Sequence, residues 1–248
     1  MIVVLGAHRD PVATALVAAW PGAALCSAQD LCAPGWVWPL ADVDADTDAN
    51  ADVSADAGAA AGGVAARRWV VQGRAVADEV VSGVFVARSA VHAAELQGTH
   101  PQDRAYLAAE LTAFVTHLLA STGAKVSTPV VDGAFGDATL RPERWMPLAA
   151  RCGLTPVPLR LQSAAPAAAQ TWAAWPVDVV GQACFGEGLA RLAPARRAAA
   201  TRLVAALGLA WARLLFDGAC RLRLIGTLAL PNEPAREALG RALLGRGT

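Results

Sequence analysis

The sequence has 248 residues, a hydrophobic content of 55% and a formal net charge of zero. This length accommodates one large domain or two small ones with a buried core. A neutral chain has no electrostatic attraction to nucleic acid or to an anionic membrane surface, so we expect neither as a partner. Because the sequence has no apolar run long enough to span a membrane and no basic start typical of a signal peptide, we expect a cytoplasmic protein.

The beginning of the chain predicts an α/β domain. Ile2–Gly6 is a short apolar run that ends in glycine, which is typical of a buried parallel strand. Pro11 then starts a helical pattern that continues to Trp20, and Ala23–Ser27 predicts a second strand. A strand–helix–strand order of this kind favours a parallel sheet with a right-handed crossover.

An acidic, alanine-rich stretch follows over Ala41–Gly63. Its alternating aspartates suggest a calcium-binding loop, which requires glycine at the sixth position and glutamate at the twelfth. A loop that starts at Asp42 has Thr47 and Val53 at these positions instead. The composition therefore favours a solvated, disordered insertion over about residues 41–63.

The rest of the chain alternates strands and helices. The spacing of Leu107, Leu111, Phe114 and Leu118 predicts one face of a helix that begins near Thr99. Asp217-Gly218 between two apolar runs predicts a hairpin. The other predicted strands are Arg68–Val71, Val84–Arg88, Lys125–Val131, Val177–Cys184 with a turn at Gly181-Gln182, Leu209–Phe216 and Arg221–Leu230. The other predicted helices are Pro142–Gly153, Pro194–Leu207 and Glu233–Leu244.

Five cysteines are present, and no two of them form a C-x-x-C pair: Cys26, Cys32, Cys152, Cys184 and Cys220. An odd number of cysteines without metal-ligand spacing does not favour a disulfide framework or a zinc site. We therefore expect buried, inert thiols in a reducing compartment.

Several segments, in a common order, resemble the ATP-grasp superfamily, and most closely its ligase-like members found near peptide-modifying enzymes. These segments are Gly83–Arg88, His100–Leu111, Thr128-Pro129, Arg141–Trp145, Leu148–Leu154, Val177–Gly181 and Leu207–Ala212. The resemblance implies an α/β fold with two parts. Residues 1–125 form a pre-ATP-grasp-like open sheet with flanking helices, and residues 126–248 form a shortened ATP-grasp-like α+β region.

The resemblance also implies a chemistry that this chain lacks residues for. An ATP-grasp ligase phosphorylates a carboxylate, which an amine then attacks, so the triphosphate must be met by cations and by Mg²⁺. The family's lysines come from a central lobe, where this chain has only the sixteen residues Gln162–Val177, without lysine or arginine. The segment that matches the family's metal strand, Leu224–Leu228, has no carboxylate, and Asp217, Asn232 and Glu233 lie outside it. We therefore expect no metal site and no cofactor, with ATP and Mg²⁺ as the alternative.

Other residues are candidates for binding. Arg88, Arg104, Arg141 and Arg144 suggest an anion-binding patch, with solvated or salt-bridged arginines as the alternative. His8 follows the first strand, where an open α/β sheet often binds ligands, although a surface histidine is the simpler interpretation. Trp172 and Trp175 suggest either an exposed interface or packing over the edge of the core.

The sequence thus favours a non-catalytic ATP-grasp-like pseudoenzyme, a binding or partner subunit in peptide or natural-product modification. A protein or peptide partner, a homo-oligomer or a heteromeric complex would cover the surface that a missing lobe leaves exposed. Autonomous ligase activity is not expected. The alternative is an ATP-dependent carboxylate–amine ligase whose phosphate site uses arginine or is completed at a subunit interface. A small-molecule sensor that binds its ligand at the loop Gly6–Asp10 is a third interpretation.

Overall fold

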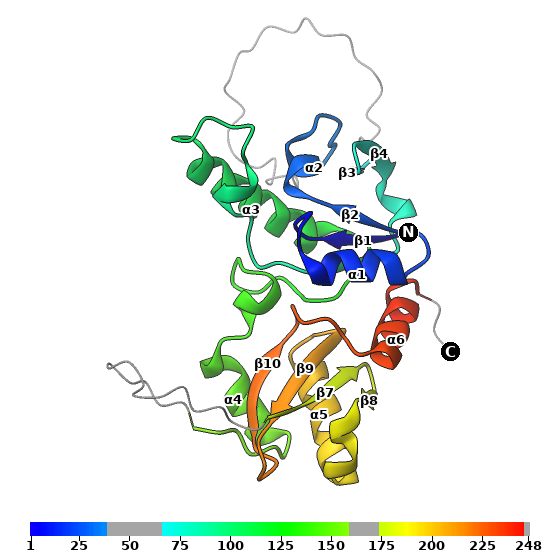
Figure 1. Ribbon diagram of the computed structural model, residues 1–248, viewed down its shortest axis with the longest axis vertical. Coiled ribbons are helices and arrows are strands. Elements are labelled where there is room, and N and C mark those ends of the chain that lie inside the picture. Colours follow the sequence, from blue (N-terminus) through cyan, green and yellow to red (C-terminus); the bar gives the residue numbers. More distant parts are fainter. Residues whose placement is uncertain (39–65, 159–173, 246–248) are drawn as a thin grey trace, which may run out of the picture.

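The computed structural model describes residues 1–38, 66–158 and 174–245, which form two units, each built around a sheet (Figure 1). The first unit has a parallel sheet in the order β2-β1-β5-β6, and the second has an antiparallel sheet in the order β10-β9-β7-β8. A separate hairpin, β3-β4, lies beside β2.

The strands are β1 (Ile2–Leu5), β2 (Ala23–Cys26), β3 (Arg68–Val71), β4 (Arg74–Ala77), β5 (Gly83–Val86), β6 (Lys125–Val126), β7 (Trp175–Val180), β8 (Ala183–Phe185), β9 (Trp211–Phe216) and β10 (Leu222–Gly226). The helices are α1 (Pro11–Ala19), α2 (Ala28–Cys32), α3 (Arg104–Ser121), α4 (Pro142–Arg151), α5 (Pro194–Ala206) and α6 (Glu233–Leu243). Short 3₁₀ helices include η2 (Ala93–Glu95) and η3 (Gly136–Thr139).

The first sheet is buried on both faces, which explains why its strands are continuous apolar runs. Side chains alternate along a strand with a period of two. Val3 and Leu5 of β1 therefore pack in the cluster that contains α3, whereas Ile2 and Val4 pack with α1 and α6. Since α6 is the last helix of the chain, the C-terminal region completes the core of the N-terminal unit.

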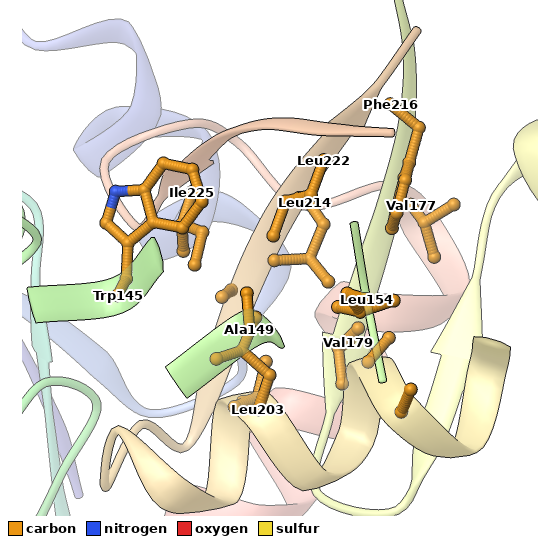
Figure 2. Close-up of a cluster of buried hydrophobic side chains, with 14 of the residues drawn as sticks. Trp145, Ala149, Leu154, Val177, Val179, Leu203, Leu214, Phe216, Leu222 and Ile225 are labelled. Atoms are coloured by element: carbon orange, nitrogen blue, oxygen red, sulfur yellow. The ribbon is translucent and has the colours of Figure 1, made fainter. Parts of the chain in front are cut away.

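One face of the second sheet packs against α4 and α5 (Figure 2). Val177 and Val179 of β7 and Leu214 of β9 point into this core together with Trp145 and Leu203 from the two helices. All five side chains are at most 2% exposed. Because side chains alternate between the two faces along each strand, the intervening residues of β7 and of β9 point to the opposite face of the sheet.

That opposite face carries a buried ion pair. Asp178 of β7 lies directly opposite Arg213 of β9 and is only 1% exposed. The guanidinium Nε donates to Asp178 Oδ1 at 2.7 Å and Nη2 donates to Oδ2 at 2.9 Å. The Asn232 backbone N–H donates to the same carboxylate at 2.7 Å, and Arg213 Nη2 donates to the Leu230 carbonyl at 2.7 Å. The pair therefore fixes the segment that connects β10 to α6.

Helix α6 then joins the two units by close packing. A Cβ atom on Gly240 would lie 2.7 Å from Nε1 of Trp20, and one on Gly83 would lie 2.6 Å from the Leu243 carbonyl oxygen. The indole N–H of Trp20 donates to the Arg236 carbonyl at 2.9 Å. Two glycines thus allow α6 to approach α1 and β5 closely.

Most predicted elements are present, but several differ in extent. The strand expected over Arg221–Leu230 runs only from Leu222 to Gly226. The strand expected over Lys125–Val131 ends at Val126. Beyond it the Ser127 hydroxyl accepts the N–H of Val86, and Pro129 has no N–H to donate to the sheet. The strand expected from Val177 begins at Trp175 and forms a hairpin with β8. Helix α3 begins at Arg104, later than the predicted Thr99. The predicted disordered insertion over 41–63 lies outside the described residues.

Replacing Asp178 by asparagine tests the role of the ion pair. The substitution preserves the shape of the side chain but leaves the guanidinium of Arg213 without its counter-charge, and Arg213 is only 24% exposed. We expect the free energy of unfolding, measured by urea denaturation, to fall by about 3 kcal/mol. The matched control is Glu237→Gln, which breaks an exposed pair with Arg241 at 3.8 Å and should change stability by less than about 0.5 kcal/mol. Equal effects of the two substitutions would contradict the assignment.

Gly240→Ala tests the docking of α6. The new methyl group would overlap the Trp20 ring, so either the ring or the helix must move. We expect a loss of about 1–3 kcal/mol in the free energy of unfolding, measured by thermal and urea denaturation. Gly98→Ala is the control, because a Cβ atom there has no heavy atom within 4 Å and the backbone φ is not positive. If Gly240→Ala left the free energy of unfolding unchanged, the contact between α6 and the Trp20 ring would not be as close as described.

Candidate functional site

The end of β10 is where the sequence resemblance locates the metal-binding strand. Gly226 ends this strand without a side chain, and Leu224 is 52% exposed. The carboxylate nearest this strand end comes from Asp137, in η3. Its Oδ1 accepts hydrogen bonds at 2.6 Å from both the backbone N–H and the hydroxyl of Thr227. Asp137 therefore ties η3 to the end of β10.

The other acidic candidates also have structural roles. Asp217 accepts hydrogen bonds from the backbone N–H and Nε of Arg221, both at 2.9 Å, and from the N–H of Ala219 at 3.0 Å. It holds the tight turn between β9 and β10. The side chain of Asn232 accepts the N–H of Ala235 and caps α6, while Glu233 is exposed in the first turn of that helix.

Asp217 and Asn232 are occupied by these structural hydrogen bonds and are not free to hold Mg²⁺. Magnesium requires octahedral oxygen ligands, and a triphosphate requires cations that face it. Within the described ranges, no group of three or more histidine, cysteine, aspartate or glutamate side chains is placed to hold a metal ion. The single lysine, Lys125, donates to the Ala242 carbonyl at 3.3 Å, at the C-terminal end of α6. Its charge there complements the helix dipole.

Two of the four predicted arginines are engaged inside the first unit. Arg88 is 6% exposed, forms an ion pair with Glu95 of η2 and donates Nε to the Ala90 carbonyl at 2.9 Å. Arg104 donates to the carbonyls of Thr99 and Gln97 at 2.9 and 3.0 Å. Both guanidinium groups thus hold loops that precede α3, and the structure does not bring them to one surface with the other two.

The other two, Arg141 and Arg144, line a cleft of about 230 Å³ at the start of α4. Asp132 and Glu143 line the same cleft, together with Val131, Ala134, Ala138 and Thr139. Sequence reasoning did not identify Asp132 or Glu143 as site residues. The Asp132-Gly133 dipeptide was nevertheless a signal for a tight turn, which is the turn that forms one wall of this cleft.

The remaining candidates lie apart from this cleft. His8 is exposed in the loop after β1. Trp175 is 9% exposed and stacks on Phe216 with ring centroids 5.1 Å apart and an interplanar angle of 22°. Of the two interpretations of this tryptophan, packing in the core is therefore the one that the structure supports. Trp172 lies outside the described residues.

The cysteines differ from the expectation of five buried thiols. Cys26 is fully buried, and burial raises the pKa of its thiol far above the ordinary range. Cys32 is exposed on α2, and the three others are half-buried. Burial also raises the pKa of Cys184, whose thiol donates to the Arg197 carbonyl. The expectation was correct for Cys26 and wrong for Cys32.

Solved structures provide the comparison. No protein-family model and no curated protein matches the sequence. Among the solved structures, macrocyclase MdnC from Microcystis aeruginosa MRC, bound with precursor peptide MdnA, matches with a TM-score of 0.63 and 12% identity over 98% of this chain and 99% of that one. A RiPP-associated ATP-grasp ligase from Chryseobacterium gregarium, in complex with ADP and a leader and core peptide, matches with a TM-score of 0.63 and 8% identity over 100% and 97% of the two chains.

A third match is the ATP-grasp ligase PsnB complexed with minimal precursor, Mg and ADP, with a TM-score of 0.57, 13% identity and coverage of 99% and 98% of the two chains. The chain has the ATP-grasp ligase fold. At identities of 8–13% the likeness concerns the fold alone. The ATP-grasp fold accounts for the parallel sheet followed by the antiparallel sheet.

Among the described residues, none of the helices has the length and apolar character that a membrane span requires.

The turn at Asp217 leads to a prediction on acid stability. Burial opposes the charge of this carboxyl, but hydrogen bonds from the Arg221 backbone and side chain and from Ala219 lower its pKa below the ordinary value. A lowered pKa stabilises the folded state above the unfolded value of about 4, and this contribution is lost as the pH falls. We expect the stability difference between the wild type and Asp217→Asn to be constant above about pH 5 and to shrink below about pH 4. Urea denaturation across this pH range measures it. A difference that persists unchanged to about pH 2.5 would contradict the assignment.

Proposed function

We propose that this protein is a non-catalytic ATP-grasp-like subunit that binds a peptide or partner protein in a peptide-modification system. The observation that carries the proposal is the structural use of carboxylates in the second sheet and at its ends. In a working ATP-grasp site, carboxylates must be free for Mg²⁺ and cations free for phosphate. Here Asp137, Asp178 and Asp217 accept hydrogen bonds from the protein's own groups.

Three further observations support the proposal. Breaking a buried pair such as Asp178–Arg213 to release a metal ligand would leave an uncompensated charge, which is costly. The cleft of about 230 Å³ is smaller than the roughly 300–1,000 Å³ typical of sites for drug-sized ligands. The similar ligases were crystallised with precursor, leader or core peptides, so a peptide is the partner class that the shared fold favours.

The alternative is an ATP-dependent carboxylate–amine ligase that uses arginines for its phosphate site. Arg141 and Arg144 favour this alternative, because both residues line one cleft. Asp132 and Glu143 oppose it, because their carboxylates line the same cleft and repel a polyphosphate.

Calorimetry with Mg²⁺ and ATP separates the two functions. We expect no saturable heat of binding up to millimolar ATP, because the described residues include no group of three or more metal-ligating side chains and Lys125 is bonded to the end of α6. Micromolar, magnesium-dependent binding would overturn the proposal. If this binding were lost in Arg141→Gln and Arg144→Gln but preserved in Arg151→Gln, the alternative function would be correct.

A second experiment uses precursor peptide MdnA, together with any precursor peptide or peptide-modifying enzyme that is encoded beside the gene. We expect a complex with a peptide or with one of these enzymes that forms equally well with and without ATP. Size-exclusion chromatography with light scattering measures the complex and the oligomeric state. A complex that forms only when ATP and magnesium are present would contradict a nucleotide-independent role.

A further inference from the structure

The cleft at the start of α4 has rigid walls. The turn Val131–Ala134 forms one wall, closed by two backbone hydrogen bonds of 2.9 Å between its end residues. Asp132 and Gly133 at its centre have φ angles of 49° and 71°, as two-residue hairpin turns of this kind require. Helix α4 forms the other wall and is anchored by Trp145, which is 2% exposed in the core (Figure 2).

The charged groups of this cleft are not paired with each other. Within residues 1–38, 66–158 and 174–245, the guanidinium groups of Arg141 and Arg144 have no hydrogen-bond or ion-pair partner. The carboxylates of Asp132 and Glu143 likewise have none in these ranges. Two cations and two anions therefore line one cleft without neutralising one another. This arrangement differs from Asp178 and Asp217, whose carboxylates form ion pairs with Arg213 and Arg221.

The size of the cleft restricts its ligand. The cleft volume of about 230 Å³ lies below the roughly 300–1,000 Å³ typical of sites for drug-sized ligands, so it suits a group about as large as one small amino-acid residue. Val131, Ala134 and Ala138 add an apolar wall that suits a short aliphatic side chain.

We propose that this cleft binds an α-carboxylate together with the N–H group beside it, as found in the C-terminal residue of a peptide or in a free amino acid. Arg141 and Arg144 bind the carboxylate through charge-assisted hydrogen bonds. Asp132 and Glu143 accept the neighbouring N–H. Inorganic phosphate can also donate from a P–OH group, but its larger negative charge is repelled by both carboxylates more strongly than the single charge of an α-carboxylate is. The combination of charges in the cleft therefore selects for a terminal amino-acid unit over a phosphate.

For a peptide, this inference rests on the proposed peptide-binding function and specifies which part of the peptide the cleft binds. Different results would contradict the peptide-binding function and the assignment of the cleft. If a whole peptide binds the wild type and the Arg141→Gln variant equally well, the cleft assignment is wrong while the peptide function stands. If no peptide binds but a terminal amino-acid unit does, the peptide function is wrong while the cleft assignment stands.

Nuclear magnetic resonance titration tests the assignment on the full chain. The probes are N-acetylalanine, which represents a peptide C-terminus, alanine, which represents a free amino acid, and inorganic phosphate. N-acetylalanine N-methylamide is the matched control, because it lacks only the carboxylate. We expect N-acetylalanine to shift the arginine Nε–Hε signals of Arg141 and Arg144 saturably, with a dissociation constant on the order of 1 mM for so small a ligand. The amide should cause no saturable shift.

Variants identify the groups that act. Arg141→Gln and Arg144→Gln should each weaken N-acetylalanine binding at least about tenfold, because a charge-assisted hydrogen bond is lost. Arg151→Gln, exposed in the last turn of the same helix, should leave it unchanged. Glu143→Gln should weaken N-acetylalanine binding and strengthen phosphate binding. Circular dichroism of each variant verifies that its fold is preserved.

The relative affinities of the probes distinguish the sources of the carboxylate. Tighter binding of N-acetylalanine than of alanine identifies a peptide C-terminus, and the reverse identifies a free amino acid. The proposal is overturned if phosphate binds at least as tightly as both, if the methylamide binds as tightly as the free acid, or if no probe gives a saturable shift.

Discussion

The ion pair between Asp178 and Arg213 is the interaction on which the joining of the two units depends. It lies on the face of the second sheet that points away from α4 and α5. A buried ion pair stabilises the fold only when further hydrogen bonds satisfy the remaining lone pairs of the carboxylate and the remaining N–H groups of the guanidinium. The Asn232 N–H and the Leu230 carbonyl provide these bonds. The segment that provides them leads directly into α6, so the pair determines where the last helix begins.

The position of α6 in turn completes the first unit. Helices α1 and α6 cover one face of the parallel sheet, and without α6 the apolar side chains of Ile2, Val4 and Phe85 would be partly exposed. Gly83 and Gly240 let this helix approach closely, and the charge of Lys125 lies at its C-terminal end. The N-terminal sheet is therefore stabilised by the last helix of the chain. The two units do not have independent hydrophobic cores, since Val180 and Trp211 of the second sheet pack in the same cluster.

The charged residues divide between structural use and availability for binding. At the end of β10 and at the turn after β9, each carboxylate accepts several hydrogen bonds from nearby groups. In the cleft at α4, four charged side chains have no partner within the described ranges. Asp132, Arg141 and Glu143 are exposed to solvent, so these side chains remain available to a ligand. This contrast is the physical basis for locating a binding function at α4 and not at the strand that resembles a metal site.

The amino-acid sequence by itself determined the elements and the likeness to ATP-grasp ligases. The spacing of apolar residues and turn dipeptides such as Asp217-Gly218 are local signals. The strands, helices and hairpin that these signals predicted are present. The sequence also showed that carboxylates and lysine are scarce where an ATP-grasp ligase needs them.

Only the tertiary structure decided which charged residues remain available, because pairing depends on contacts between residues far apart in the chain. Asp178 meets Arg213, and Asp137 meets Thr227, through sheet pairing and loop packing that no local spacing encodes. The four arginines differ for the same reason. Arg88 and Arg104 bond to loops of their own unit. Arg141 and Arg144 instead line a cleft whose other wall is the turn Val131–Ala134, before η3.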